Sequence, residues 1–206
     1  MDNNIYKMLT KDQIKIMQVF VSKITQSFTI RGVAKTLKKD HAQIHKAIQP
    51  LIKVLLNQTQ EKRLVLNYKE NSEELAYIEY LRTKEFLTTP KNKTLKFFIN
   101  DVMKVIKDEY FIMILFGSVV KTNNPRDIDV FVIVDNLNKI DSTDRFLGNI
   151  ASRYSLKFDI NVVSVESIYE MAGHRDEKNV LNELLNKHLI IYGGENFYKL
   201  LKNARR

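Results

Sequence analysis

Two apolar runs joined by a short polar spacer constrain the fold of this chain more than any other feature. Residues 112–118 read IMILFGS, and residues 127–134 read DIDVFVIV. Short apolar runs bounded by turn residues are typical of strands that are buried on at least one face. Side chains two residues apart on a strand point to the same side of the sheet. The sequence therefore predicts that Asp127 and Asp129 are neighbouring carboxylates beside a small-residue turn.

These paired carboxylates predict a site for a divalent cation. Two like charges so placed repel one another unless a cation lies between them or one of them takes up a proton. Hard divalent cations prefer oxygen ligands such as carboxylates. The turn at Gly117-Ser118 is the place where a phosphate could approach such an ion.

The motif made by Gly117-Ser118, the spacer, Asp127 and Asp129 resembles the signature of nucleotidyltransferases of the polymerase-beta superfamily, especially the minimal prokaryotic type. The resemblance implies that Gly117 and Ser118 hold the β- and γ-phosphates of a nucleotide. It also implies that Asp127 and Asp129 ligate Mg²⁺ or Mn²⁺, and that a third carboxylate on a neighbouring strand completes the site.

A third strand with an acidic residue follows later in the chain. Residues 157–163 read KFDINVV, and Phe158, Ile160 and Val162 alternate to one face. Asp159 is thereby placed on the other face. The resemblance implies that Asp159 ligates a second metal ion and helps to deprotonate the acceptor.

The resemblance also implies the reaction. An acceptor hydroxyl attacks the α-phosphate of a nucleoside triphosphate (NTP), and pyrophosphate is released. Metal ions held by Asp127 and Asp129 would offset charge on the attacking and leaving oxygens. Lys121, close to the turn, is a further candidate for binding the nucleotide.

The positive charge of the chain is concentrated in its first third. The net charge of the whole chain is +9, and residues 1–69 hold 13 Lys and Arg but only 4 Asp and Glu. Lys and Arg balance Asp and Glu in the rest of the chain. A polyanion-binding module in the N-terminal third is the simplest interpretation.

The same third has the pattern of three capped helices. Thr10, Thr29 and Asp40 each precede an apolar series with helical spacing, and residues 63–68 look like a strand. A short break separates the second helix from the third, as in a helix-turn-helix. Residues 10–70 thus resemble the winged helix-turn-helix of prokaryotic transcription regulators.

The third helix is expected to run to Leu55, with a kink at Pro50, which lacks a backbone N–H group. Its exposed face supplies the candidate DNA-binding residues, since Gln and His can meet base edges and Lys meets phosphate. The candidates are Gln43, His45, Lys46, Gln49 and Lys53.

The expected fold is α+β, with a winged helix-turn-helix in residues 1–70 and a helical linker in residues 71–93. Residues 94–206 are expected to form a nucleotidyltransferase-like domain, a mixed sheet with flanking helices. The chain has no cysteine, which excludes disulfides, and no apolar run approaches the roughly 20 residues that span a bilayer. The cytoplasm is therefore the expected compartment.

Three functional hypotheses stay open on the sequence alone. The first is an Mg²⁺-dependent nucleotidyltransferase that a DNA-binding module directs to its target. The second is a transcription regulator whose nucleotidyltransferase-like domain is inactive, senses a nucleotide or serves for homodimerisation. The third is an antitoxin-like protein that modifies or masks a partner, because minimal nucleotidyltransferases in some systems pair with a helical partner protein.

Overall fold

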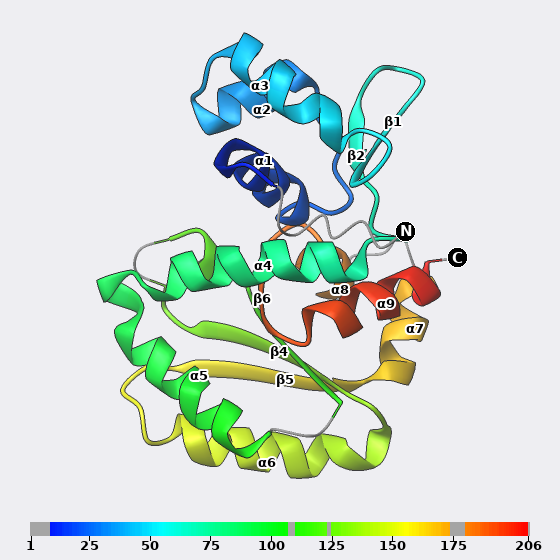
Figure 1. The fold of residues 1–206 in the computed structure, drawn as a ribbon. Helices are drawn as coiled ribbons and strands as arrows, with labels where there is room; N and C mark the ends of the chain where they lie inside the picture. The colour runs from blue at the N-terminus through cyan, green and yellow to red at the C-terminus, as the bar shows by residue number, and fades with distance from the viewer. Residues whose placement is uncertain (1–8, 107–109, 123–124, 174–179, 206) are drawn as a thin grey trace.

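The computed structural model describes residues 9–106, 110–122, 125–173 and 180–205. In this part of the chain, α4 lies between a helical N-terminal unit and a mixed sheet with flanking helices (Figure 1). The short 3₁₀ helices are labelled η. In chain order the elements are α1 (Lys11–Val21), α2 (Ile30–Leu37), α3 (His41–Ile48), η2 (Gln49–Leu51), β1 (Leu56–Gln58), β2 (Leu64–Leu66), α4 (Ser72–Leu87), η3 (Pro90–Asn92), α5 (Lys93–Val105), β3 (Phe111–Phe116), η4 (Gly117–Val120), β4 (Ile128–Val134), η5 (Leu137–Lys139), α6 (Ile140–Ala151), β5 (Phe158–Ser164), α7 (Val165–Gly173), α8 (Val180–Leu184), β6 (His188–Tyr192) and α9 (Gly194–Ala204).

The predicted caps of the first three helices are confirmed. Thr10 and Gln13 form a reciprocal capping box, in which each side chain accepts a hydrogen bond from the other residue's backbone N–H group. Thr29 caps α2, and Asp40 caps α3 through bonds of 2.8 and 3.1 Å from two backbone N–H groups. These local bonds fix where each helix begins, because the first N–H groups of a helix have no partner within it.

The third helix is shorter than expected. It ends at Ile48 and is followed by η2, in whose first turn Pro50 lies. Proline cannot donate a backbone hydrogen bond, and its ring collides with the carbonyl of the preceding turn. Lys53 follows in the left-handed conformation with a φ of 72°. The expectation that Lys53 lies on the third helix is therefore wrong.

A small hairpin follows the three helices. β1 and β2 pair antiparallel, with Leu56 opposite Leu66. The strand expected at residues 63–68 is thus found as its central part. Leu64 also exchanges backbone hydrogen bonds of 2.9 and 2.8 Å with Phe28, which precedes α2. The hairpin is thereby tied to the helices, and Leu56, Leu64 and Leu66 are buried.

The described residues of the C-terminal half contain a four-stranded sheet in the order β5-β4-β3-β6. β3 is antiparallel to both β4 and β6, whereas β4 and β5 are parallel. The crossover between the parallel pair is provided by α6, as parallel strands require a long connection. The expected mixed sheet with flanking helices is confirmed.

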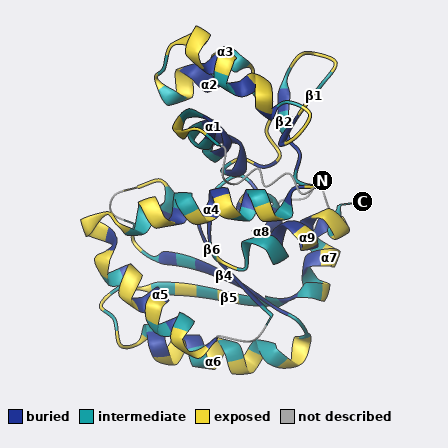
Figure 2. Ribbon diagram, viewed as in Figure 1, coloured by how far each residue is buried: buried dark blue, intermediate teal, exposed yellow. Residues whose placement is uncertain are grey.

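The two faces of this sheet are covered by different helices (Figures 1 and 2). One face packs on α5 and α6 through Met113, Leu115, Val130 and Val132. The other packs on α4, α8 and α9 through Ile112, Ile114, Phe131 and Ile133. Since alternate residues of a strand face opposite sides, Asp129 belongs to the α4, α8 and α9 face.

α4 connects the two halves by packing and not only by sequence. It packs against α1 on one side and against α9 and β6 on the other. One continuous hydrophobic core includes Phe20 of α1, Ile44 of α3, Ile78 of α4 and Ile190 of β6. No described helix is both long enough and apolar enough to cross a membrane.

Candidate active site

The tight turn after β3 is packed directly against Asp129. Gly117 has a φ of 68°, a left-handed conformation that favours glycine. A Cβ atom at this position would collide with the carboxylate of Asp129. The backbone N–H group of Ser118 donates a hydrogen bond to the same carboxylate. The small residues of the motif therefore allow backbone and carboxylate to approach closely.

The register of the sheet brings Asp129 and Asp159 side by side. Asp129 of β4 is the direct partner of Asp159 in the parallel strand β5, and of Phe116 in β3. Directly paired residues of neighbouring strands point to the same face. Asp127 precedes β4 by one residue at the same end of the sheet. Three carboxylates predicted from separate points of the chain thus meet at one end of the sheet, beside the Gly117 turn.

The electrostatics of Asp129 reflect this crowding. Burial raises the pKa of the Asp129 carboxyl, and the negative charge of Asp127 raises it further. The hydrogen bond from Ser118 opposes the rise, while Asp159 and Glu183 add to it. The ionised form of Asp129 is therefore disfavoured unless a positive charge binds nearby.

Glu183 was not predicted from the sequence as a residue of this site. It lies on α8, which covers the same sheet face, and its charge acts on Asp129. It also pairs with Lys187 at 3.7 Å. Nothing in the local sequence distinguishes Glu183 from other surface acids, and only the packing of α8 brings it to the site.

The aspartates do not form a ready-made metal centre. Within the described ranges, no group of three or more His, Cys, Asp or Glu side chains is placed so that it could hold a metal ion. The donor chemistry of Asp127, Asp129 and Asp159 nevertheless suits a hard divalent cation, because all three supply carboxylate oxygens. Metal ligation by these residues stays a prediction.

Two hollows lie next to the turn. One, of about 250 Å³, is lined by Asp127, Arg126 and Val119, among others. The other, of about 590 Å³, includes Lys121 and lies between α1 and α4. Lys121 is exposed, and its backbone N–H group donates to the Ser118 carbonyl at 2.9 Å. The candidate nucleotide-binding residue therefore adjoins the turn, on the side that faces α4.

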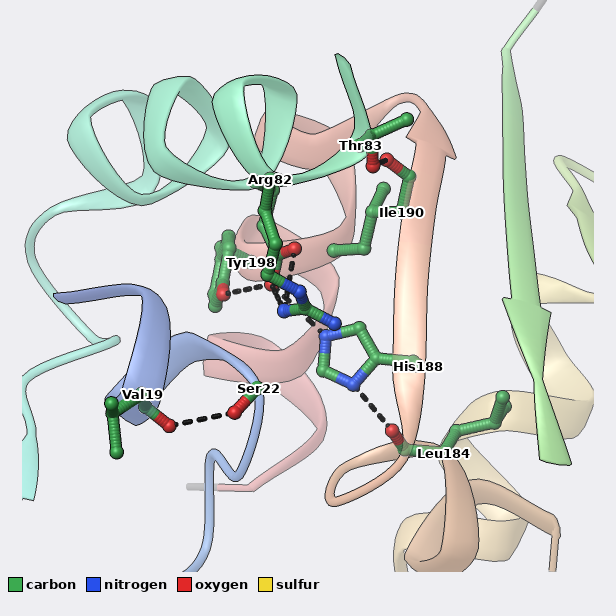
Figure 3. Close-up of polar contacts among 9 residues, drawn as sticks. Val19, Ser22, Arg82, Thr83, Leu184, His188, Ile190 and Tyr198 are labelled. Carbon is green, nitrogen blue, oxygen red and sulfur yellow. Dashed lines mark hydrogen bonds and ion pairs between the residues drawn. The ribbon is translucent and has the colours of Figure 1, made fainter. Parts of the chain in front are cut away.

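A buried polar cluster joins α4, β6 and α9 (Figure 3). Glu79 of α4 accepts hydrogen bonds from Arg82 at 2.9 and 3.1 Å and from the Tyr198 hydroxyl at 3.2 Å. His188 Nε2 lies 3.0 Å from the same carboxylate, and His188 Nδ1 lies 2.5 Å from the Leu184 carbonyl. Each ring nitrogen of His188 thus lies within hydrogen-bond distance of an oxygen atom.

This cluster lies next to the Gly117 turn. His188 is the first residue of β6 and pairs with Phe116, which directly precedes Gly117. The Glu79 and His188 side chains are 1% and 0% exposed, so both are fully removed from solvent. No local pattern predicts this cluster, because Glu79 and His188 are 109 residues apart.

The candidate DNA-binding residues all lie at the surface, and only some of them share an element. Gln43, His45 and Lys46 are on α3, whereas Gln49 begins η2 and Lys53 lies in the turn after it. The Gln43 amide donates to Asp12 of α1 at 2.6 Å. Together with the ion pair from Lys39, this bond lowers the pKa of Asp12. The Gln43 side chain therefore holds α3 to α1.

The close approach at Gly117 leads to a stability prediction. Gly117→Ala is expected to destabilise the protein by about 1–3 kcal/mol, because alanine is strained at a φ of 68° and its Cβ meets Asp129. Gly148→Ala in α6 is the matched control, since its Cβ has no heavy atom within 4 Å. That control should gain roughly 0.4–1 kcal/mol. Urea unfolding of both variants measures the difference, and equal effects would contradict the packing described here.

One curated relative comes from Methanocaldococcus jannaschii and bears the name "Putative protein adenylyltransferase MJ0141". It is 35% identical to this chain over 68 residues, which make up 32% of this chain and 68% of the relative. No model of a protein family matches the chain, and no solved structure matches it significantly. Since the match covers more than two thirds of a relative named for adenylyl transfer, the chain belongs to a family of nucleotidyltransferases.

Proposed function

We propose that the chain transfers a nucleoside monophosphate from an NTP to a hydroxyl acceptor in a reaction that depends on Mg²⁺. The observation that carries this proposal is the register of β4 and β5, which pairs Asp129 with Asp159 beside the Gly117-Ser118 turn. The raised pKa of Asp129 supports it, because a cation among these carboxylates would relieve their repulsion.

The residues take the following roles in the proposed reaction. Ser118 and the backbone amides of the turn hold the phosphates, and the Lys121 ammonium adds positive charge beside them. Asp127, Asp129 and Asp159 hold the metal ions, which supply electrostatic stabilisation of the charge that develops on the phosphate oxygens.

The bond changes balance as follows. The acceptor oxygen forms a bond to the α-phosphorus while the bond from that phosphorus to the β-phosphate oxygen breaks. Pyrophosphate leaves with the electron pair of that bond. Asp159 accepts the proton of the acceptor hydroxyl and passes it to solvent.

The test is nucleotidyl transfer by the full-length protein. The protein is incubated with each of the four α-labelled ribonucleoside triphosphates, Mg²⁺ or Mn²⁺, and either oligonucleotides or host-cell protein as acceptors. We expect incorporated label and released pyrophosphate, both of which disappear with EDTA. A protein acceptor is included because the relative is named a protein adenylyltransferase, and labelling of a host protein would favour the antitoxin-like hypothesis. Absence of both products with every NTP would contradict the proposal.

We further propose that residues 1–70 form a winged helix-turn-helix that binds duplex DNA, joined through residues 71–93 to the nucleotidyltransferase domain in residues 94–206. The order of three helices followed by an antiparallel hairpin supports this assignment, as does the excess of positive charge in residues 1–69. If transfer is absent and DNA binding is present, the hypothesis of a transcription regulator gains support.

Lys46 and Lys53 test the DNA-binding surface. Lys46→Ala and Lys53→Ala are each expected to weaken duplex binding at all sequences and to reduce the slope of log affinity against log salt by about 1. The physical reason is the loss of one phosphate contact and its released counterion. Lys96→Ala on α5 serves as the charge-matched control. Fluorescence anisotropy at several salt concentrations gives both quantities, and wild-type slopes in both variants would refute this placement.

A further inference from the structure

An open cleft of about 590 Å³ separates the N-terminal unit from the sheet. Its walls come from α1, α2 and α4, from the end of η4 and the residue after it, and from the start of β6 with the two residues before it. It reaches Val120 and Lys121, and the Lys121 backbone N–H group donates a hydrogen bond to the Ser118 carbonyl. The cleft therefore ends within one turn of the proposed phosphate-binding residues.

The cleft is lined by more basic than acidic side chains, although Arg82 pairs with Glu79 and Lys187 pairs with Glu183. Five basic side chains and one carboxylate, that of Glu85, line it, and the basic ones are Lys15, Lys23, Arg82, Lys121 and Lys187. Glu85 pairs with Lys15 at 2.6 Å. In the described part of the chain, no carboxylate forms an ion pair with Lys121 or Lys23, and the Lys23 ammonium lies 5.9 Å from the centroid of the Phe28 ring. An excess of positive charge in a concave wall attracts polyanions.

Arg82 lies in the wall of the cleft. Its Nη1 atom donates to the buried carboxylate of Glu79, which fixes the guanidinium (Figure 3). Its Nη2 atom is also buried and has no hydrogen-bond partner among the described residues. This atom is closed off from the cleft, so Arg82 contributes to the wall through its charge and not through a direct contact with a ligand.

The walls also contain apolar groups, including Val19, Leu37 and the ring of Phe86. A lining that combines basic side chains with apolar ones and Phe86 suits a single nucleic-acid strand, whose phosphates carry charge and whose bases expose flat apolar faces. A duplex keeps those faces stacked inside. An acidic peptide carries negative charge but has no flat ring that could pack against Phe86.

We propose that this cleft binds single-stranded nucleic acid as the acceptor of nucleotidyl transfer, with the terminal hydroxyl of the strand next to the Gly117-Ser118 turn. The acceptor role rests on the transfer function proposed above, whereas strand binding stands by itself. The strand contacts are distinct from the exposed α3 surface proposed for duplex DNA.

The experiment measures binding of a fluorescent 12-nucleotide RNA to the full-length protein without any triphosphate. The test variant is Lys23→Gln with Lys187→Gln, and the control is Lys96→Gln with Lys202→Gln, which removes the same charge from α5 and α9. We expect the test variant to bind about tenfold more weakly at 0.1 M salt, and its salt slope to fall by roughly 1.4 for two lost phosphate contacts. The control should bind within about twofold of wild type.

Lys187→Gln removes the partner of Glu183, so the single variant Lys23→Gln, which breaks no ion pair, is measured as well. We expect this variant to lose about 0.7 of the salt slope. Wild-type affinity in both test variants, or equal losses in test and control variants, would overturn the cleft as a strand site. Displacement of the RNA by poly-glutamate at equal charge concentration would overturn it in favour of an acidic protein.

A second readout separates this inference from the function on which its acceptor role depends. Where transfer to RNA is observed, Lys23→Gln should raise the KM for RNA several-fold and leave kcat nearly unchanged, because Lys23 lies outside the reacting groups and pairs with none of their neighbours. An unchanged KM would overturn the acceptor role. Absence of transfer to every acceptor, with intact RNA binding, would refute the proposed function and leave the strand site standing, whereas transfer to protein but not to RNA would overturn the acceptor role.

Discussion

Asp127→Asn and Asp129→Asn are each expected to slow nucleotidyl transfer by roughly 10²–10³-fold, because a lost metal ligand removes several kcal/mol of stabilisation from the transition state. An asparagine keeps the size of the side chain and one acceptor oxygen but carries no charge. The measurement is the initial rate of label transfer at saturating NTP. Asp144→Asn is the matched control, since Asp144 is an exposed acid on α6, which covers the opposite sheet face.

Asp129→Asn is expected to slow nucleotidyl transfer but to stabilise the folded protein. These opposite effects on activity and stability make the prediction more specific. The pKa of Asp129 is higher in the folded chain than in the unfolded chain, so its ionisation at neutral pH disfavours folding. Asp129→Asn removes this repulsion. In EDTA at pH 7 it should raise the thermal midpoint by about 2–4 °C for each kcal/mol gained. A variant that loses both activity and stability would instead point to a structural role of the carboxylate.

Glu79→Ala is expected to lower the free energy of unfolding by about 3–5 kcal/mol. The substitution leaves the Arg82 guanidinium, whose side chain is only 12% exposed, without its counter-charge. It also removes the acceptor for Tyr198 and for His188. Urea unfolding of the full-length protein, followed by far-UV circular dichroism, measures the loss.

Glu85→Ala on the same helix is the control for this prediction. Glu85 pairs with Lys15 at the surface, where its side chain is 62% exposed, and such pairs contribute less than about 1 kcal/mol. Glu79→Gln should lie between the two, because its amide oxygen can still accept a hydrogen bond. Equal losses for Glu79→Ala and Glu85→Ala would show that the buried cluster contributes little to stability.

The helices and strands that the sequence specified well are those with a local cause. The caps at Thr10, Thr29 and Asp40 depend on bonds that span two or three residues, and all three are found. The apolar alternation of residues 158–162 correctly places Asp159 on the face opposite Phe158. The end of α3 was misjudged because helical spacing of leucines continued past Pro50, and the backbone constraint of proline prevailed over that pattern.

The residues of the candidate site likewise fall into two groups, those that a local sequence pattern predicts and those that it does not. Asp127, Asp129 and the Gly117 turn were found from the sequence because they lie within one motif whose spacing carries the information. Glu183, the Glu79 cluster and the cationic cleft were not found, since each consists of groups that are unremarkable in their own segment.

The start of most helices and strands, the residues that face inward and the acidic motif beside a glycine turn can all be predicted from the amino-acid sequence. These features follow from periodicity and from hydrogen bonds between near neighbours. Three other features depend on the folded arrangement: the pairing of Asp159 with Asp129, the position of Glu183 on α8 near them, and the basic cleft between α1 and α4. Such contacts join residues tens of positions apart, and they are fixed by how buried surfaces pack in three dimensions, which no local pattern encodes.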